Sequence, residues 1–252
     1  MDLFHGKKQT YQKNFRNFLF SLKIEYPKYY SYQGRKVTKK ISLSKRDLIE
    51  KIYNQYSLDE YVIKYHHNKN FNKKIVLPNE FKKVCIEIGF GNGDFLIKNA
   101  ISYPEELFIG IEVYLNGIAK VLKTITDLGL KNIILSNLNS IYFLEALMHN
   151  SIDKIFIINP DPWIKKRHNK RRLISFEFLE LLSKIIKSEN SIYITTDSRS
   201  YLNDIKDIFS ENKDCLSTYD VKILSKNDKL YGISRYQRKA IEKGRNIYQL
   251  TL

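Results

Sequence analysis

From residue 84 onward, short apolar runs alternate with stretches of helical periodicity, and this alternation constrains the fold more than any other feature of the chain. The runs span residues 84–88, 107–112, 132–136, 154–159 and 191–195. Residues 115–129 carry an apolar stripe at helical spacing and close with a glycine, and residues 175–187 open with a serine suited to capping a helix. Strands and helices that alternate in this way predict an α/β domain with a mostly parallel, doubly wound sheet and helices on both faces.

The first 80 residues are more basic than the rest of the chain. Residues 1–80 hold 17 Lys or Arg against 7 Asp or Glu. Ser44 and Asp47 form a capping-box-like start to a predicted helix. Aromatic and basic residues interleave at residues 26–36, which offers stacking faces for bases. We therefore predict a basic, partly helical N-terminal appendage over residues 1–80 and a second domain over residues 81–252, with nucleic acid or an anionic membrane as the favoured partner.

A glycine-rich loop follows the first apolar run. Its glycines are spaced G-x-G-x-G from Gly89, not G-x-G-x-x-G as in dinucleotide-binding loops, and Asp94 occupies the helix start that a pyrophosphate would need. Glu87 and Asp94 instead suit a cationic ligand, and S-adenosylmethionine carries a sulfonium and an ammonium around an adenosine. Glu112, after the second run, is placed to accept hydrogen bonds from ribose hydroxyls or, alternatively, to cap the next helix. A dinucleotide oxidoreductase is disfavoured.

Two prolines bracket Asp161 at the end of the fourth apolar run. Each proline pushes the residue before it out of the α region, so we expect Asn159 and Asp161 to be held extended. That constraint favours a positioned carboxylate at Asp161. Trp163 follows, and stacking on a base and sealing the core are about equally good interpretations of it.

A cationic run begins directly after the tryptophan. Six of the eight residues from Lys165 to Arg172 are Lys or Arg, a density suited to gripping phosphate oxygens, although a solvated loop explains the run about as well. The residues that we expect to contact a nucleic-acid backbone are Lys166, Arg167, Lys170, Arg171 and Arg172.

Together these features resemble the bacterial tRNA (guanine-N(7))-methyltransferases. The likeness also includes residues 108–112, the Thr195-Thr196-Asp197 stretch and the closing segments 234–238 and 246–250, and it covers about residues 84–250. The resemblance implies a Rossmann-like class I methyltransferase fold. It also implies methyl transfer from S-adenosylmethionine to the nitrogen at ring position 7 of a guanosine in the tRNA variable loop, which forms 7-methylguanosine. The N-terminal extension would then contact RNA.

The resemblance further implies roles for individual residues. Cofactor contacts would fall on Glu87, Gly89, Gly91, Glu112, Asn139 and Asp161, and substrate contacts on Lys165, Asp197, Ser234, Arg235, Tyr236 and Gln237. Several positions depart from the family pattern: Asn139 stands for Asp, Ser234 for Thr, Gln237 for Glu, and Asn159 and Ser198 for aromatic residues. An amide oxygen still accepts from an adenine amine, so Asn139 is compatible with a weakened cofactor site.

The implied reaction needs no strong base, because the attacking guanine nitrogen already carries an in-plane lone pair. Positioning and electrostatics then supply most of the catalysis. Positive charge develops on the purine, so a buried carboxylate beside it favours the transition state. Asp161 is the candidate catalytic residue and Asp197 a second acid, with helix capping or turn formation as their alternative roles.

Composition limits the remaining possibilities. The net charge is +16, and two cysteines far apart in the sequence argue against a disulfide framework or a zinc site, so we expect no metal. No apolar run approaches the roughly 18–20 residues of a membrane span, and the first residues lack the apolar core of a signal peptide. We therefore expect a cytoplasmic protein without a membrane partner, as a monomer or a homodimer.

Two further functions stay open at this stage. One is an S-adenosylmethionine-dependent methyltransferase that acts on another RNA or a small molecule. The other is a tRNA-binding protein of this fold with little turnover, which Asn139 and Gln237 keep open because both replace acids.

Overall fold

The computed structural model describes residues 41–67, 73–189, 191–211, 220–224 and 234–252. The aromatic and basic stretch at residues 26–36, for which we predicted base stacking, lies outside the described residues.

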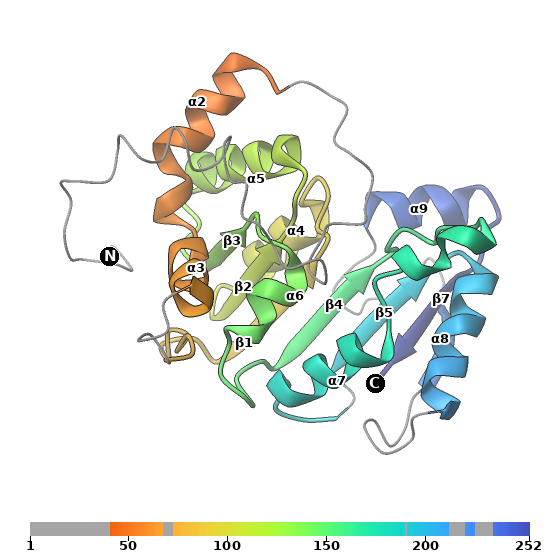
Figure 1. The fold of residues 1–252 in the computed structure, drawn as a ribbon. Coiled ribbons are helices and arrows are strands. Elements are labelled where there is room, and N and C mark those ends of the chain that lie inside the picture. The colour runs from red at the N-terminus through yellow and green to blue at the C-terminus, as the bar shows by residue number, and fades with distance from the viewer. Residues whose placement is uncertain (1–40, 68–72, 190, 212–219, 225–233) are drawn as a thin grey trace.

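Within the described residues, seven strands form one sheet in the order β3-β2-β1-β4-β5-β7-β6 (Figure 1). Five of them are parallel and match the apolar runs to within one residue at each end: β1 (Lys83–Ile88), β2 (Glu106–Ile111), β3 (Ile133–Ser136), β4 (Lys154–Ile158) and β5 (Ile192–Thr196). The mostly parallel, doubly wound sheet is therefore confirmed. Two strands were not predicted, β6 (Asp220–Leu224) and β7 (Ile247–Thr251), and β7 runs antiparallel to both β5 and β6.

Helices cover both faces of the sheet. In β1, Val84 and Ile86 pack on one face and Cys85 on the other, which explains why the run is continuously apolar. One face carries α2 (Leu43–Ile52), α4 (Asp94–Ser102) and α5 (Leu115–Leu128). The other carries α3 (Asp59–His67), α6 (Ser140–Glu145), α7 (Phe176–Ile185) and α8 (Arg199–Glu211), while α9 (Arg235–Glu242) packs near β6 and β7.

Two predicted helix ends have the expected chemistry. The Ser175 side chain accepts a hydrogen bond from the Phe178 amide and caps α7. Gly129 ends α5 with a φ of +65°, the left-handed conformation in which glycine carries no steric penalty. A third prediction was wrong: α2 begins at Leu43 after Ser42, so Ser44 lies inside the helix and forms no capping box.

The later part of the predicted N-terminal appendage packs against the sheet. Ile49 and Tyr53 are fully buried in the core on one face, and Leu58 and Val62 belong to the core on the other. The Leu135 amide of β3 donates to a backbone carbonyl just after the short helix η2 (Tyr53–Gln55), at 2.6 Å. Residues 41–67 thus cover the β3 edge of the sheet, while the domain boundary at residue 80 stays a prediction.

Candidate active site

The glycine loop between β1 and α4 turns at the carboxyl ends of the parallel strands. Gly91 and Gly93 have φ values of +56° and +75°, a left-handed conformation that side chains with a Cβ rarely adopt. A Cβ at Gly93 would also lie 2.1 Å from a Val121 methyl group, whereas one at Gly91 would meet nothing within 4 Å. The loop is therefore tightly turned against α5 and leaves backbone open to a ligand. It lies where β1 has β2 on one side and β4 on the other, which is the ligand-binding crevice of doubly wound sheets.

Glu112 connects this loop to the start of α5. Its carboxylate accepts a hydrogen bond from the Gly91 amide at 2.8 Å and another from the Tyr114 amide at 2.9 Å. Tyr114 is the N-cap of α5, so the alternative role that we considered, support of the helix start, is present. A carboxylate has further lone pairs for hydroxyl donors, and the ribose contact of Glu112 stays a prediction.

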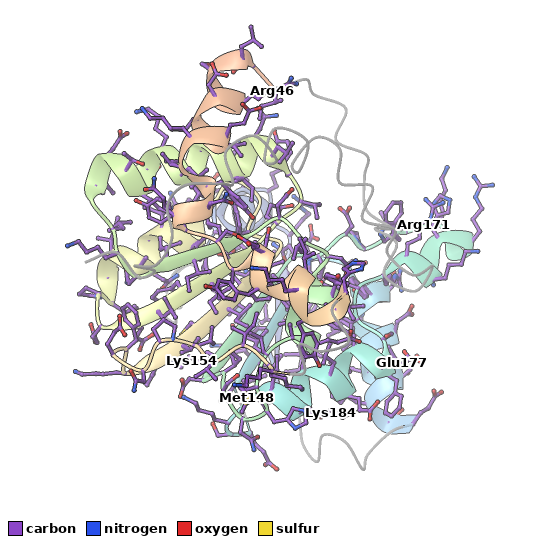
Figure 2. The ribbon with its side chains drawn as sticks, turned by 60° about the vertical axis from the view of Figure 1, so that its left-hand side comes forward. Arg46, Met148, Lys154, Arg171, Glu177 and Lys184 are labelled. Atoms are coloured by element: carbon purple, nitrogen blue, oxygen red, sulfur yellow. The ribbon has the colours of Figure 1, made fainter. Side chains whose placement is uncertain are left out.

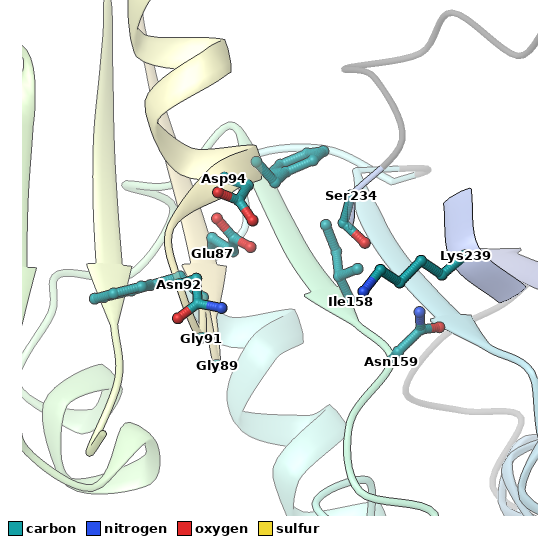
Figure 3. A pocket seen from close by; sticks show the side chains of 11 residues that line it. Glu87, Gly89, Gly91, Asn92, Asp94, Ile158, Asn159, Ser234 and Lys239 are labelled. Carbon is teal, nitrogen blue, oxygen red and sulfur yellow. The ribbon is translucent and has the colours of Figure 1, made fainter. Parts of the chain in front are cut away.

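A cleft of about 490 Å³ opens beside the glycine loop (Figure 3). That volume is within the range of small-molecule sites. Figure 3 shows Glu87 and Asp94 on one side and Ser234, Asn159 and Lys239 on the other. The lining residues come from the end of β1, the glycine loop, α4, the end of β4, and α9 with its N-cap: Glu87, Gly89, Phe90, Gly91, Asn92, Asp94, Phe95, Ile158, Asn159, Ser234 and Lys239.

Glu87 gives the cleft its electrostatic character. The side chain is 4% exposed, and burial, together with the nearby acids Glu112 and Asp94, raises its pKa to about 8. The carboxylate accepts a hydrogen bond from the Leu96 backbone, but its buried Oε2 has no partner among the described residues. Asp94 is paired with Lys120 at 2.7 Å. A buried acceptor of this kind favours a cationic or hydrogen-bond-donating ligand.

A hydrogen-bonded network of three side chains holds the opposite wall. Gln237 is 2% exposed, and its Nε2 donates to Thr195 Oγ1 at 3.0 Å. Thr195 Oγ1 donates in turn to Asn159 Oδ1 at 3.2 Å. Gln237 also forms a capping box with Ser234 at the start of α9. Gln237, predicted to contact substrate, therefore acts here as a buried link between α9 and β5, while Ser234 lines the cleft.

The conformation expected around Asp161 was wrong in two respects. Asn159 has a φ of +48° and is not extended; asparagine tolerates the left-handed region, and the bonds to Thr195 hold it there. Asp161 is exposed and is not among the lining residues of the cleft, so the expected burial of this carboxylate is also absent. Trp163 is half-buried with a φ of +41°, a conformation that costs energy in a residue with a large side chain.

The cationic run forms a short helix, η3 (Lys166–Arg171), at the end of the molecule opposite Lys154, the residue that begins β4 (Figure 2). The Arg171 guanidinium lies 5.0 Å from the Trp163 ring centroid, and the His168 ring meets the same indole edge-on at 5.7 Å. Trp163 thus supports the cationic loop. Lys165, Arg167 and Lys170, in or next to this short helix, are exposed.

Arg172 is a correction to the predicted phosphate-binding set. Its side chain is only 5% exposed and forms an ion pair with Asp204 of α8. Its Nε donates to the Pro162 carbonyl at 2.8 Å, and its guanidinium lies 4.8 Å from the Tyr201 ring centroid. Through these contacts the guanidinium of Arg172 binds the loop to α8, so it is not available to a phosphate.

The remaining predicted residues divide into two groups. Asp197 follows β5 and pairs with Arg245, and Asn139 caps α6 by accepting from the Ile141 amide at 2.9 Å. Neither lines the cleft. The side chains of Lys166, Arg235 and Tyr236 lie outside the described part of the structure, so their predicted contacts stay predictions.

The sequence did not single out Lys239 or Asn92, both of which line the cleft. Asn159 stood out for its expected extended backbone and as a departure from a family pattern, but not as a lining residue of the cleft. Lys239 lies on α9, five residues after Ser234, in a segment for which no helix was predicted. Its basic side chain facing an acidic wall could have been suspected only from the fold.

Two features are absent from the described residues. None of their helices is both long and apolar enough to cross a membrane. They also contain no cluster of three or more His, Cys, Asp or Glu that could hold a metal ion.

Comparison with known proteins agrees with the family resemblance that the sequence motifs indicated. The chain matches the Methyltransf_4 family model, described as "Putative methyltransferase", over residues 81–250. It is 36% identical over 194 residues to the tRNA (guanine-N(7)-)-methyltransferase of Wolbachia pipientis wMel, an alignment that covers 75% of this chain and 83% of that protein. It is also 36% identical to the bifunctional methyltransferase of Rickettsia felis, over 67% of this chain.

The Rickettsia protein is much longer than the aligned region, so the chain spans about a third of the length of the first curated relatives that it matches, 32% in this case. Among solved structures, the 16S rRNA (adenine(1408)-N(1))-methyltransferase from Catenulisporales acidiphilia superposes with a TM-score of 0.47. It is 14% identical, and the superposition covers 71% of this chain and 94% of that one.

Proposed function

We propose that this chain, which belongs to the tRNA (guanine-N(7))-methyltransferase family, transfers a methyl group from S-adenosylmethionine to the nitrogen at ring position 7 of a guanosine in the tRNA variable loop. One observation supports the proposal most strongly. The end of β4 lines the acidic cleft, and the chain that continues from it forms the cationic loop. Ile158 and Asn159 line the cleft, and Lys165 begins the cationic residues a few positions later. A cationic donor and a polyanionic acceptor are therefore attracted to neighbouring places.

The cleft fits S-adenosylmethionine on the evidence of its own side chains. The buried, unpartnered Oε2 of Glu87 is an acceptor at the wall of a cleft large enough for a nucleoside. When bound, S-adenosylmethionine would supply a methyl group activated by the positive charge on its sulfur. Glu87 and Asp94 would hold its cationic part, Gly91 would allow close backbone approach, and Glu112 would accept from ribose hydroxyls.

Lys239 and Ser234 give the cleft a polar and cationic side opposite Glu87 (Figure 3). An amino-acid group carries both an ammonium and a carboxylate, so a cleft with acids on one side and a lysine on the other is matched to both charges. Asn139 would accept from the adenine amine through an oxygen that already caps α6.

The acceptor side depends on groups that reach solvent. Lys165, Arg167 and Lys170 would bind phosphates of the tRNA and fix its register. Asp161 is exposed beside them, where its carboxylate would accept hydrogen bonds from the edge of a guanine and offset the positive charge that develops on the ring. Asp197 would act from the end of β5, oriented by Arg245. The N-terminal extension would add further RNA contacts, and we place the reaction in the cytoplasm.

Methyl transfer to a tRNA pool, followed by nuclease digestion and nucleoside analysis, tests the proposal directly. We expect labelled 7-methylguanosine with the wild-type chain. Asp161→Ala should lose nearly all transfer while it still binds tRNA, and Asp161→Asn should retain binding with intermediate loss. Label on a different atom would redirect the proposal to another RNA methyltransferase. Binding of tRNA without any transfer would favour a binding protein of this fold.

A further inference from the structure

A buried carboxylate outside the cleft connects the N-terminal segment to the end of β3. Asp59, the first residue of α3, is 3% exposed. It accepts three hydrogen bonds: from Tyr53 Oη at 2.7 Å, from Ser136 Oγ at 2.6 Å and from the Asn137 amide at 3.1 Å. Ser136 is the last residue of β3, and Asn137 begins the turn that follows it. Asp59 therefore binds that turn across a separation of 77 residues in the sequence.

Burying a carboxylate in this way costs desolvation free energy. Burial raises the pKa of the Asp59 carboxyl, while its hydrogen bonds oppose that shift. Replacing a buried charge and its partners by apolar groups is often neutral or stabilising, so stability alone is a weak reason for this network. A buried polar network does, however, fix one geometry of the chain, because each donor has a single well-placed acceptor.

The turn that Asp59 holds adjoins both residues expected to contact the adenosine. The Asn137 side chain donates to the Glu112 carbonyl at 2.9 Å. Two residues further on, Asn139 caps α6 by accepting from the Ile141 amide. The position of the turn therefore sets where the Glu112 backbone and the Asn139 amide lie relative to each other.

A second contact from α3 fixes the other side of the same turn. The His66 ring stacks on Tyr142 of α6 with centroids 3.7 Å apart and an interplanar angle of 20°. His66 Nε2 also lies 2.8 Å from the Tyr142 carbonyl oxygen. Asp59, at the start of α3, thus holds the chain just before Asn139, and His66, near the end of α3, holds it just after Asn139.

We infer that Asp59 is a positioning residue for cofactor binding: through Ser136 and Asn137 it holds the turn that places Asn139 and Glu112 against the adenosine of S-adenosylmethionine. This inference rests on the proposed function. It assigns to the N-terminal segment a part in the cofactor site in addition to any part in RNA binding.

Two variants and two controls test this role. Asp59→Asn cannot accept from all three donors, because one of its two side-chain atoms is now itself a donor. Ser136→Ala removes the contact from the turn and leaves α3 unchanged. Tyr53→Phe removes a bond to the same carboxylate from within the N-terminal segment. Val62→Ala removes buried apolar volume from α3 but no hydrogen bond to the turn, so it controls for a loss of stability alone.

Dissociation constants for S-adenosylmethionine, S-adenosylhomocysteine and tRNA would be measured for each variant, together with kcat at saturating cofactor. We expect Asp59→Asn and Ser136→Ala to weaken both cofactor forms by about tenfold, the loss typical of a hydrogen bond to a charged group. The loss should be equal for both forms, because the turn contacts the part that they share. The tRNA affinity, and kcat once cofactor saturates, should stay within about twofold of wild type, as should all constants of Tyr53→Phe and Val62→Ala.

The inference is overturned if Ser136→Ala and Asp59→Asn bind cofactor as tightly as Val62→Ala does, because the network would then serve stability only. If Asp59→Asn does not fold, Ser136→Ala alone decides between these outcomes. A wild-type chain that binds no S-adenosylmethionine would instead overturn the proposed function and this inference together, and that result is distinct from wild-type binding with unaffected variants.

Discussion

Binding of S-adenosylmethionine should release a proton from Glu87. The pKa of this buried carboxyl is about 8 in the free protein, so at pH 7 about nine molecules in ten carry it protonated. A cationic ligand stabilises the carboxylate, and the proton must then leave. We expect about 0.9 proton released from Glu87 per cofactor bound at pH 7, and progressively less as the pH rises through 8. Over the same range the affinity should rise by up to about tenfold per pH unit and level off above pH 8.

Isothermal titration calorimetry measures this release. The observed enthalpy is recorded at one pH in buffers of different ionisation enthalpy, and its slope against that enthalpy is the number of protons released. Glu87→Gln is the control, because the amide has similar size and no titration; its slope should be near zero at pH 7, where the ligand's own ammonium stays protonated. A zero slope for the wild-type chain at pH 7 would refute the assignment of Glu87 as the titrating partner of the ligand.

S-adenosylhomocysteine separates two versions of the same idea. It lacks the sulfonium charge but keeps the ammonium. If Glu87 opposes the sulfonium, the product should release less than about half as much proton as the cofactor. If Glu87 binds the ammonium, both ligands should release the same amount.

The raised pKa also predicts a pH dependence of folding. The folded pKa of Glu87, about 8, lies above its ordinary value of 4.5. Its contribution to the free energy of unfolding is therefore fully present below about pH 4.5 and is lost as the pH rises to about 8. Glu87→Gln should be more stable than the wild-type chain at pH 8–9 in urea unfolding, with the difference shrinking toward pH 5. A constant difference across this range would contradict the shift.

Three further variants separate binding from folding. Lys165→Ala combined with Arg167→Ala should weaken tRNA binding and reduce the slope of log affinity against log salt by about 2, with cofactor affinity unchanged; an unaltered slope would remove both residues from the RNA surface. Arg172→Ala should instead lower the free energy of unfolding by about 1–3 kcal/mol in urea titrations and leave the salt slope as it is. Gln237→Glu, although it restores the family residue, should destabilise the fold by about 1–3 kcal/mol because a carboxylate cannot donate to Thr195; equal stability in urea would argue that the hydroxyl simply reverses its role.

The sequence predicted the strands best where consecutive residues are all buried. The parallel strands are covered on both faces, so each is a run of apolar residues that stands out without knowledge of its neighbours. The strand β6 was missed because it is only partly buried, as the exposed Ile223 illustrates. The strand β7 was missed because Gln249 and Thr251 interrupt its apolar residues. Their place in the sheet depends on pairing between distant residues, which no local pattern encodes.

In the candidate site, too, features with a local sequence signal were predicted, and features that depend on distant partners were not. The glycine loop and Glu87 were predicted because turn chemistry and an acid at a strand end are local signals. Arg172 was assigned to phosphate binding because a cationic run looks uniform in sequence. Its separate role depends on Asp204, 32 residues away. Gln237 is similar, because its partner Thr195 lies 42 residues away.

The strand order has a consequence for how the chain matures during synthesis. On the ribosome the parallel strands β1 to β5 emerge first and can assemble with β5 as a temporary edge. The strand β6 emerges next but has no partner there, because the position between it and β5 belongs to β7, which is made later. The helix α9, which brings Ser234 and Lys239 to the cleft, lies in the sequence between these two strands. We therefore expect a nascent chain to present an incomplete cleft until β7 inserts, so that cofactor capture follows the last step of sheet assembly.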